Sequence, residues 1–160
     1  MMMKHNLIKI LLLALFILPT VCLAQQQVDQ NQVSIRAFYS SLAVICQSPN
    51  FDDFYKQYTV LLDEYASSSF KQSVLSELDD PNSPAADIAT DDNGIQKLSL
   101  SNLKVEKRGT FYFVRYPIYD SDEKKYIEIG LKITLDSHGK IQSVSGSYTK
   151  EIKAPTDLNK

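Results

Sequence analysis

Residues 126–148 read YIEIGLKITLDSHGKIQSVSGSY. Apolar and polar residues alternate from Tyr126 to Leu135, which is the period of a strand with one buried face. The apolar set of this strand is Ile127, Ile129, Leu131, Ile133 and Leu135. Asp136–Lys140 supplies the residues of a hairpin loop, and Ile141–Tyr148 returns as a further strand. This stretch therefore predicts an antiparallel hairpin.

Two more strands are predicted before this hairpin. Phe111–Tyr119 alternates aromatic and β-branched residues, and Leu98–Val105 precedes it across a turn at Lys107-Arg108-Gly109. Pro117 has no N–H group to donate to a neighbouring strand, so it indicates an edge position or a bulge that bends the sheet. We therefore expect about four antiparallel strands in a bent sheet.

The first half of the chain has a helical period instead. Apolar residues recur every three or four positions from Val33 to Cys46, from Phe51 to Tyr65 and from Phe70 to Leu78. Asn50 and either Ser67 or Ser68 are the expected N-caps of the second and third helices. Helices followed by hairpin-linked strands indicate an α+β fold, in which three N-terminal helices pack on a bent antiparallel sheet to give a cone-like domain.

A long loop is predicted between the helices and the strands. Asp79–Gly94 contains two prolines and five aspartates, with almost no large apolar residue. Aspartate oxygens suit calcium, but the spacing in this loop matches no calcium-binding frame, so we favour a solvated acidic surface loop. One cysteine and one histidine remain after residue 24, which excludes an ordinary zinc site. We expect neither a metal nor a cofactor.

The N-terminus has the features of a secretory signal. Lys4 and Lys9 precede the apolar run Ile10–Leu18, and small residues precede a cut after Ala24. The apolar run is shorter than the roughly 20 residues that span a bilayer, so no membrane span is expected once the signal is removed. A lipoprotein cut before Cys22 is the less favoured alternative. These features predict export to the periplasm or beyond.

The rest of the chain is expected to form one domain. Residues 25–31 are read as a flexible lead-in, 32–152 as a single α+β domain and 153–160 as a polar tail. The net charge is -2 and no block of basic residues occurs, which argues against a nucleic-acid partner. Cys46 falls on the apolar side of the first helix and is read as a small buried hydrophobic residue.

Several segments together resemble a known superfamily. They are Ile35–Tyr39, Tyr65–Leu78, the loop with Asp87 and Asp91-Asp92, and Asp136–Ile141 with Val144. In this order they resemble the nuclear-transport-factor-two-like (cystatin-like) cone fold, and within it small exported bacterial proteins of unknown function. The resemblance implies a fold and a compartment but no reaction, because this superfold hosts isomerases, dehydratases, transport adaptors and binding modules.

Catalytic groups are hard to assemble from this sequence. His138 lies in the predicted hairpin loop, where a solvated turn residue is the simpler interpretation. A cone-fold enzyme would place a carboxylate among tyrosines, but no aspartate or glutamate is an evident candidate for burial there. If a small-ligand carrier or isomerase-type enzyme is nevertheless correct, its cavity is expected to be lined by Phe38, Tyr39, Leu42 and Tyr58.

The strand Phe111–Tyr119 is apolar on both faces, which a sheet covered on one side does not require. Its second face carries Phe111, Phe113, Arg115 and Tyr119, of residue types that are enriched at protein interfaces. A protein partner, a homodimer through the sheet, or the chain's own termini and loops would cover them. We therefore expect an exported, non-catalytic binding protein, such as an envelope adaptor or an immunity protein, whose acidic charge would suit a basic partner.

Overall fold

The computed structural model describes residues 29–80, 87–91 and 94–155. These residues form three α-helices, two short 3-10 helices and one four-stranded sheet. In chain order they are α2 (Gln30–Ile45), α3 (Phe51–Tyr65), α4 (Ser68–Asp79), η1 (Ile88–Thr90), η2 (Lys97–Ser99), β1 (Lys104–Arg108), β2 (Phe111–Asp120), β3 (Lys125–Leu135) and β4 (Ile141–Ile152). The strand order is β1-β2-β3-β4 and every pairing is antiparallel. The predicted α+β fold, with helices before strands, is confirmed.

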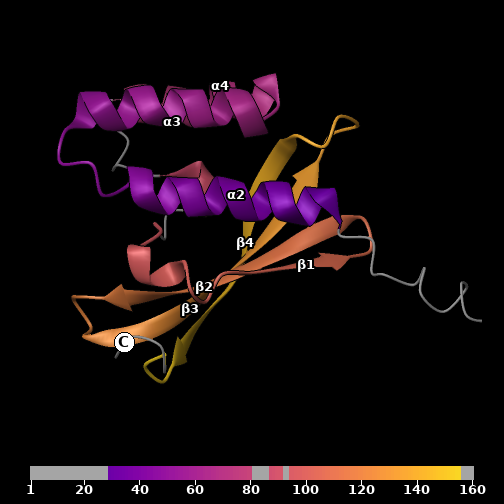
Figure 1. The fold of residues 1–160 in the computed structure, drawn as a ribbon. Coiled ribbons are helices and arrows are strands. Elements are labelled where there is room, and N and C mark those ends of the chain that lie inside the picture. The colour runs from indigo at the N-terminus through magenta and orange to yellow at the C-terminus, as the bar shows by residue number, and fades with distance from the viewer. Residues whose placement is uncertain (1–28, 81–86, 92–93, 156–160) are drawn as a thin grey trace, which may run out of the picture.

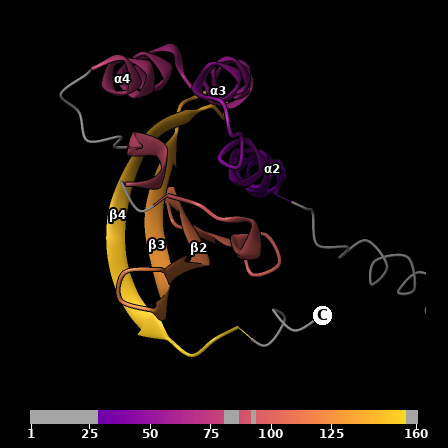
Figure 2. The ribbon, with the colours of Figure 1, turned by 90° about the vertical axis from the view of Figure 1, so that its left-hand side faces the viewer.

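The sheet curves and the helices lie on its concave side (Figures 1 and 2). The core lies between these layers, where β3 contributes the apolar set that its alternation predicts and β2 contributes Tyr112, Val114, Tyr116 and Ile118. From the helices, Phe38, Tyr39, Leu42, Tyr58 and Leu62 are fully buried against them. None of the described helices is both long and apolar enough to cross a membrane.

Side-chain caps fix where the helices begin. Asn50 caps α3 by accepting from the backbone N–H of Asp52, and Ser67 caps α4 by accepting from that of Phe70. α2 begins at Gln30, slightly before the expected start, because Asp29 supplies a cap there. Residues 1–28, with the predicted signal and most of the lead-in, lie outside the described residues.

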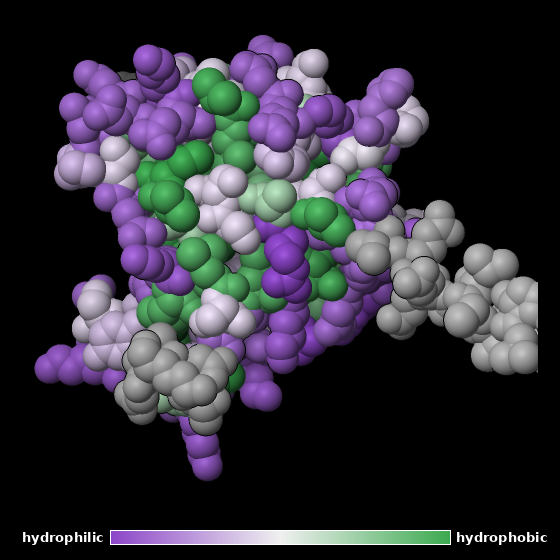
Figure 3. All heavy atoms as spheres, in the orientation of Figure 1, coloured by the Kyte–Doolittle hydropathy of each residue, from purple (hydrophilic) through white to green (hydrophobic). Residues whose placement is uncertain are grey.

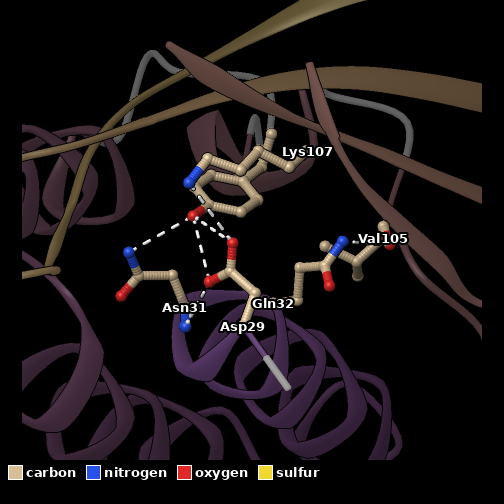
Figure 4. A network of polar contacts seen from close by, with 6 residues as sticks. Asp29, Asn31, Gln32, Val105 and Lys107 are labelled. Carbon is tan, nitrogen blue, oxygen red and sulfur yellow. Dashed lines mark hydrogen bonds and ion pairs between the residues drawn. The ribbon is translucent and has the colours of Figure 1, made fainter. Parts of the chain in front are cut away.

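Asp29 also ties the start of α2 to the sheet (Figure 4). Its carboxylate accepts from the backbone N–H of Asn31 at 3.0 Å and from the Tyr112 hydroxyl at 3.0 and 3.2 Å. The ammonium of Lys107 lies 3.5 Å away. Burial alone would raise the pKa of Asp29, but these hydrogen bonds and the nearby charge lower it below its ordinary value.

Replacing Asp29 with alanine should lower the free energy of unfolding by about 1 kcal/mol at neutral pH, because the N-cap is lost. Since the pKa is lower in the folded state, the stabilisation by the charged carboxylate is present above the unfolded value of about 3.9 and is lost as the pH falls through the folded value. Urea unfolding at neutral pH and at about pH 3 should therefore show the gap between wild type and Asp29→Ala shrinking in acid. Asp29→Asn, which keeps an acceptor for the cap, is the control, and an equal gap at both pH values would contradict this role.

The prediction of a strand over Leu98–Val105 is wrong for most of its length. Residues 97–99 form η2, and β1 begins only at Lys104, paired with Arg115. The β1–β2 pairing stops at Arg115 and does not reach Pro117, which is paired only with Glu128 of β3, and the Ser99 hydroxyl donates to the Pro117 carbonyl at 2.6 Å on the side that β1 leaves open. Side-chain hydrogen bonds thus replace strand pairing at this end of β2.

The described part of the Asp79–Gly94 loop is not confined to the surface, contrary to prediction. Ala89 and Thr90 of η1 are fully buried. Residues 81–86 and 92–93 lie outside the described residues.

The prediction for Cys46 is also wrong, because this residue caps the C-terminus of α2 and is exposed. Although the residue as a whole is exposed, burial of its thiol, together with the charge of Asp87, raises the pKa of Cys46 to about 12.

Candidate functional site

The outer sheet face, turned away from the helices, carries all four residues predicted to bind a partner. Side chains alternate along β2, so that Tyr112 and Tyr116 enter the core while Phe111, Phe113, Arg115 and Tyr119 point outward. The cross-strand register adds further residues to this outer sheet face. They are Lys104, Glu106 and Arg108 from β1, Tyr126, Glu128, Gly130 and Lys132 from β3, and Tyr148, Lys150 and Ile152 from β4.

Phe113 lies at the centre of this face and is covered by its own chain. Its ring is only 4% exposed. The Arg108 guanidinium lies 4.1 Å from the ring centroid, and the Tyr148 ring packs at 5.8 Å. For Phe113, therefore, covering by the chain itself is the interpretation that the structure supports.

The aromatic residues at the two ends of β2 are more accessible. Phe111 is half-buried, with the Lys132 ammonium 4.9 Å from its ring centroid. Tyr119 is 37% exposed and packs against Tyr126 at 5.0 Å. Two aromatic contact points thus flank the covered centre.

Arg115 connects these aromatic residues to a charged cluster. Its guanidinium pairs with Glu106, which also binds Arg108 at 3.0 Å, and hydrogen bonds from both arginines lower the pKa of Glu106. Within residues 29–80, 87–91 and 94–155, the buried Arg115 Nε has no hydrogen-bond acceptor. A buried donor without an acceptor is uncommon in folded proteins.

The charge of the outer sheet face is opposite to that of the chain. The whole sequence has a net charge of -2. The outward positions of the strands carry more cations than carboxylates. The cations are Lys104, Arg108, Arg115, Lys132 and Lys150, and the carboxylates are Glu106 and Glu128. The expectation of a basic partner, based on net charge, therefore does not fit this face, which complements an acidic surface.

The residues predicted to line a cavity lie together in the core. Phe38, Tyr39, Leu42 and Tyr58 are each 0% exposed. The rings of Phe38 and Tyr39 meet edge to face at 5.1 Å, and Tyr39 packs on Tyr116 at 6.1 Å. All four side chains named for the cavity belong to one buried cluster that also includes the inward residues of β2.

Three core tyrosines hold the segment around η1. Hydroxyls of Tyr39 and Tyr58 donate to the Ala89 carbonyl and to Asp87 Oδ1, each at 2.8 Å. Tyr116 donates to the Gly94 carbonyl at 3.1 Å. Burial is the main cause that raises the pKa of all three tyrosines, and the charge of Asp87 adds to it, so their hydroxyls stay protonated and donate these hydrogen bonds.

Asp87 is the residue that the sequence interpretation missed. It supplies a carboxylate beside tyrosines, the pair for which the sequence offered no evident candidate. It belongs to a loop without periodicity, so no spacing pattern placed it near Tyr58.

Among the described residues, no group of three or more His, Cys, Asp or Glu side chains is arranged to hold a metal ion.

Comparison with known proteins adds no further assignment. No family model matches the chain, and neither a curated protein nor a solved structure does.

Proposed function

We propose that this chain is an exported, non-catalytic binding protein that holds an acidic partner protein on the outer sheet face. The observation that carries the proposal is the concentration of cations and half-exposed aromatic rings on one face of an acidic chain. Tyrosine, phenylalanine and arginine are the residue types that anchor protein interfaces. An envelope adaptor and an immunity protein that masks an exported toxin are both compatible roles.

Charge segregation supports a protein partner of a particular kind. A basic face on an acidic molecule orients the approach of an acidic surface and repels it elsewhere. Tyr119 and Phe111 offer apolar contact at the two ends of the face, with Arg115 between them. The partner is accordingly expected to combine carboxylates with an apolar centre.

Export is supported by the sequence features of residues 1–24, and the resemblance to exported cone-fold proteins agrees with it. The protein should be recovered from the envelope fraction of its host, where its intact mass should correspond to a chain starting at Gln25.

Partner binding is tested by cross-linking in the host and purifying the tagged protein. Arg115→Glu combined with Lys132→Glu should reduce the amount of the main cross-linked partner at least tenfold, because two cations of the outer sheet face become carboxylates. Where close charge pairs across an interface are net favourable, each is coupled by about 1.5 kcal/mol or more, which corresponds to about tenfold in affinity. The remaining binding should weaken further as salt is raised.

Lys97→Glu is the matched control, since it reverses an exposed lysine on η2, away from this face. It should leave the cross-linked partner unchanged. Equal recovery of every partner with the double variant and with the control would refute the proposal.

A small-ligand carrier or isomerase-type enzyme is the second candidate. The observation in its favour is the Asp87 carboxylate. It accepts a hydrogen bond from the Tyr58 hydroxyl, and its charge raises the pKa of Tyr39 and of Tyr116. A ligand with polar groups would have to replace the acceptors of these hydroxyls, which are the Ala89 carbonyl, the Asp87 carboxylate and the Gly94 carbonyl. The cost of Phe38→Ala separates this candidate from a solid core, because a ligand cavity beside Phe38 would make that substitution cheap.

A further inference from the structure

A second surface, on the helices, also exposes large hydrophobic side chains. Five large hydrophobic side chains are exposed in the described residues, and three of them, Val33, Val44 and Val60, lie on the solvent side of α2 and on α3. Phe51 is on the opposite side of α3 from Val60, where it packs against Phe54 and Tyr55. Figure 3 views this side, where hydrophobic side chains gather across the middle and hydrophilic ones border them above. An apolar centre with a polar rim is the anatomy of a protein interface.

The solvent side of α2 has almost no charge. Val33, Ala37 and Val44 follow one another along it at helical spacing. Arg36 is the one charged residue between Gln30 and Ile45, and its guanidinium donates to the Leu103 carbonyl at 2.6 Å. A helix that faces only water normally carries charged residues on that side.

A groove of about 460 Å³ separates this side of α2 from α3. Its lining residues are Ser41 and Ile45 from α2, with Asp53, Lys56, Gln57, Val60, Leu61 and Glu64 from α3. Most of the lining therefore comes from α3, so the arrangement of charges on α3 decides what fits against it.

On α3, Lys56, Val60 and Glu64 stand four residues apart and share one stripe. The stripe is complementary to itself: a second copy of α3, antiparallel and centred on Val60, would place Lys56 opposite the partner's Glu64 and Glu64 opposite the partner's Lys56. Lys56 forms no ion pair with any residue of the described part of the chain. We propose that the α2–α3 face binds a second copy of this chain in a two-fold dimer with α3 antiparallel to α3.

The area of the α2–α3 face sets the expected affinity of the dimer. α2 has 16 residues, so it is about 24 Å long, and two adjacent helices present a face about 20 Å wide. About 500 Å² from each copy lies at the lower end of specific interfaces. The dimer should therefore be in rapid exchange, with a Kd in the micromolar range. The outer sheet face stays open in this dimer, so the proposal is independent of the proposed function.

Sedimentation velocity over a wide concentration range tests the charge pairs directly. The protein is purified in the mature form that its expressing cell produces. Wild type should dimerise with a micromolar Kd. Lys56→Glu and Glu64→Lys should each weaken dimerisation about tenfold or more, because like charges then face each other across the two-fold axis. The double variant Lys56→Glu/Glu64→Lys should restore it.

Val60→Asp tests the centre of the face and should abolish the dimer without affecting the fold, because Val60 is exposed, and circular dichroism checks that the helices persist. Lys153→Glu, which reverses an exposed lysine just after β4, should leave dimerisation unchanged. A monomer at every concentration would overturn the proposal. A dimer that the double variant fails to restore, or that Lys153→Glu disrupts while Val60→Asp does not, would overturn it as well.

Discussion

Phe38→Ala is expected to lower the free energy of unfolding by about 3–5 kcal/mol, the usual cost of removing a fully packed phenylalanine. Phe38 is 0% exposed, and its ring contacts Tyr39 at 5.1 Å and Tyr65 at 6.1 Å. The loss combines the transfer of the ring from water with the cavity that it leaves. Urea unfolding of wild type and variant measures the difference, provided that the slope of both transitions is the same.

Phe51→Ala is the matched control, because it makes the same substitution at an exposed position of α3. It should change the free energy of unfolding by about 0.5 kcal/mol or less. The comparison also decides between the two candidate functions. A loss for Phe38→Ala as small as that of the control would mean that Phe38 borders open space, as a ligand cavity requires, and would favour the carrier over the binding protein.

Periodicity was sufficient to predict the elements that bury one continuous face. The alternation over 126–135 corresponds to β3, and the helical spacing from Phe51 to Tyr65 gives the bounds of α3. In both segments the apolar set is long and regular, so the choice of structure is made locally. The outward direction of Phe111, Phe113, Arg115 and Tyr119 follows from the same alternation.

Contacts between distant segments were not predictable in this way. The Tyr39 hydroxyl, from α2, donates to Ala89 of η1, and the Tyr116 hydroxyl, from β2, donates to Gly94 beyond it. η2 replaces a predicted strand because Ser99 donates to Pro117, 18 residues away. None of these interactions can be recognised in the local sequence pattern. The sequence therefore did not predict that part of the loop is buried, or that Asp87 lies beside the core tyrosines.

The neighbours of Phe113 depend on register, which the sequence also does not specify. The hairpin pairs Leu135 with Ile141, and regular counting from this pair would set Gly130 opposite Gly146. Two register shifts in β3–β4 set Gly130 opposite Tyr148 instead. The Tyr148 ring then lies over Gly130 and against Phe113, which explains why the centre of the outer sheet face is closed.

This arrangement makes Gly130 a position where one methyl group should be costly. A Cβ atom there would lie 2.6 Å from Cε1 and 2.8 Å from Cδ1 of Tyr148. The ring would have to leave Phe113 and lose its hydrogen bond to Glu128. We expect Gly130→Ala to lower the free energy of unfolding by about 1–3 kcal/mol, the range for overpacking a well-packed site.

Without the Tyr148 ring, Gly130→Ala is expected to no longer lower the free energy of unfolding. Gly130 has no positive φ, so alanine fits its backbone, and in a Tyr148→Ala background the same substitution should be neutral or stabilise by about 0.4–1 kcal/mol. A double-mutant cycle in urea measures the coupling between the two positions, expected to be about 1–3 kcal/mol. If Gly130→Ala costs the same in both backgrounds, backbone strain and not the Tyr148 ring is responsible, and the account of how this face is closed is wrong. If the coupling is found, Gly130→Ala also provides a folded variant with Phe113 uncovered, in which partner binding through the aromatic centre of the outer sheet face can be measured directly.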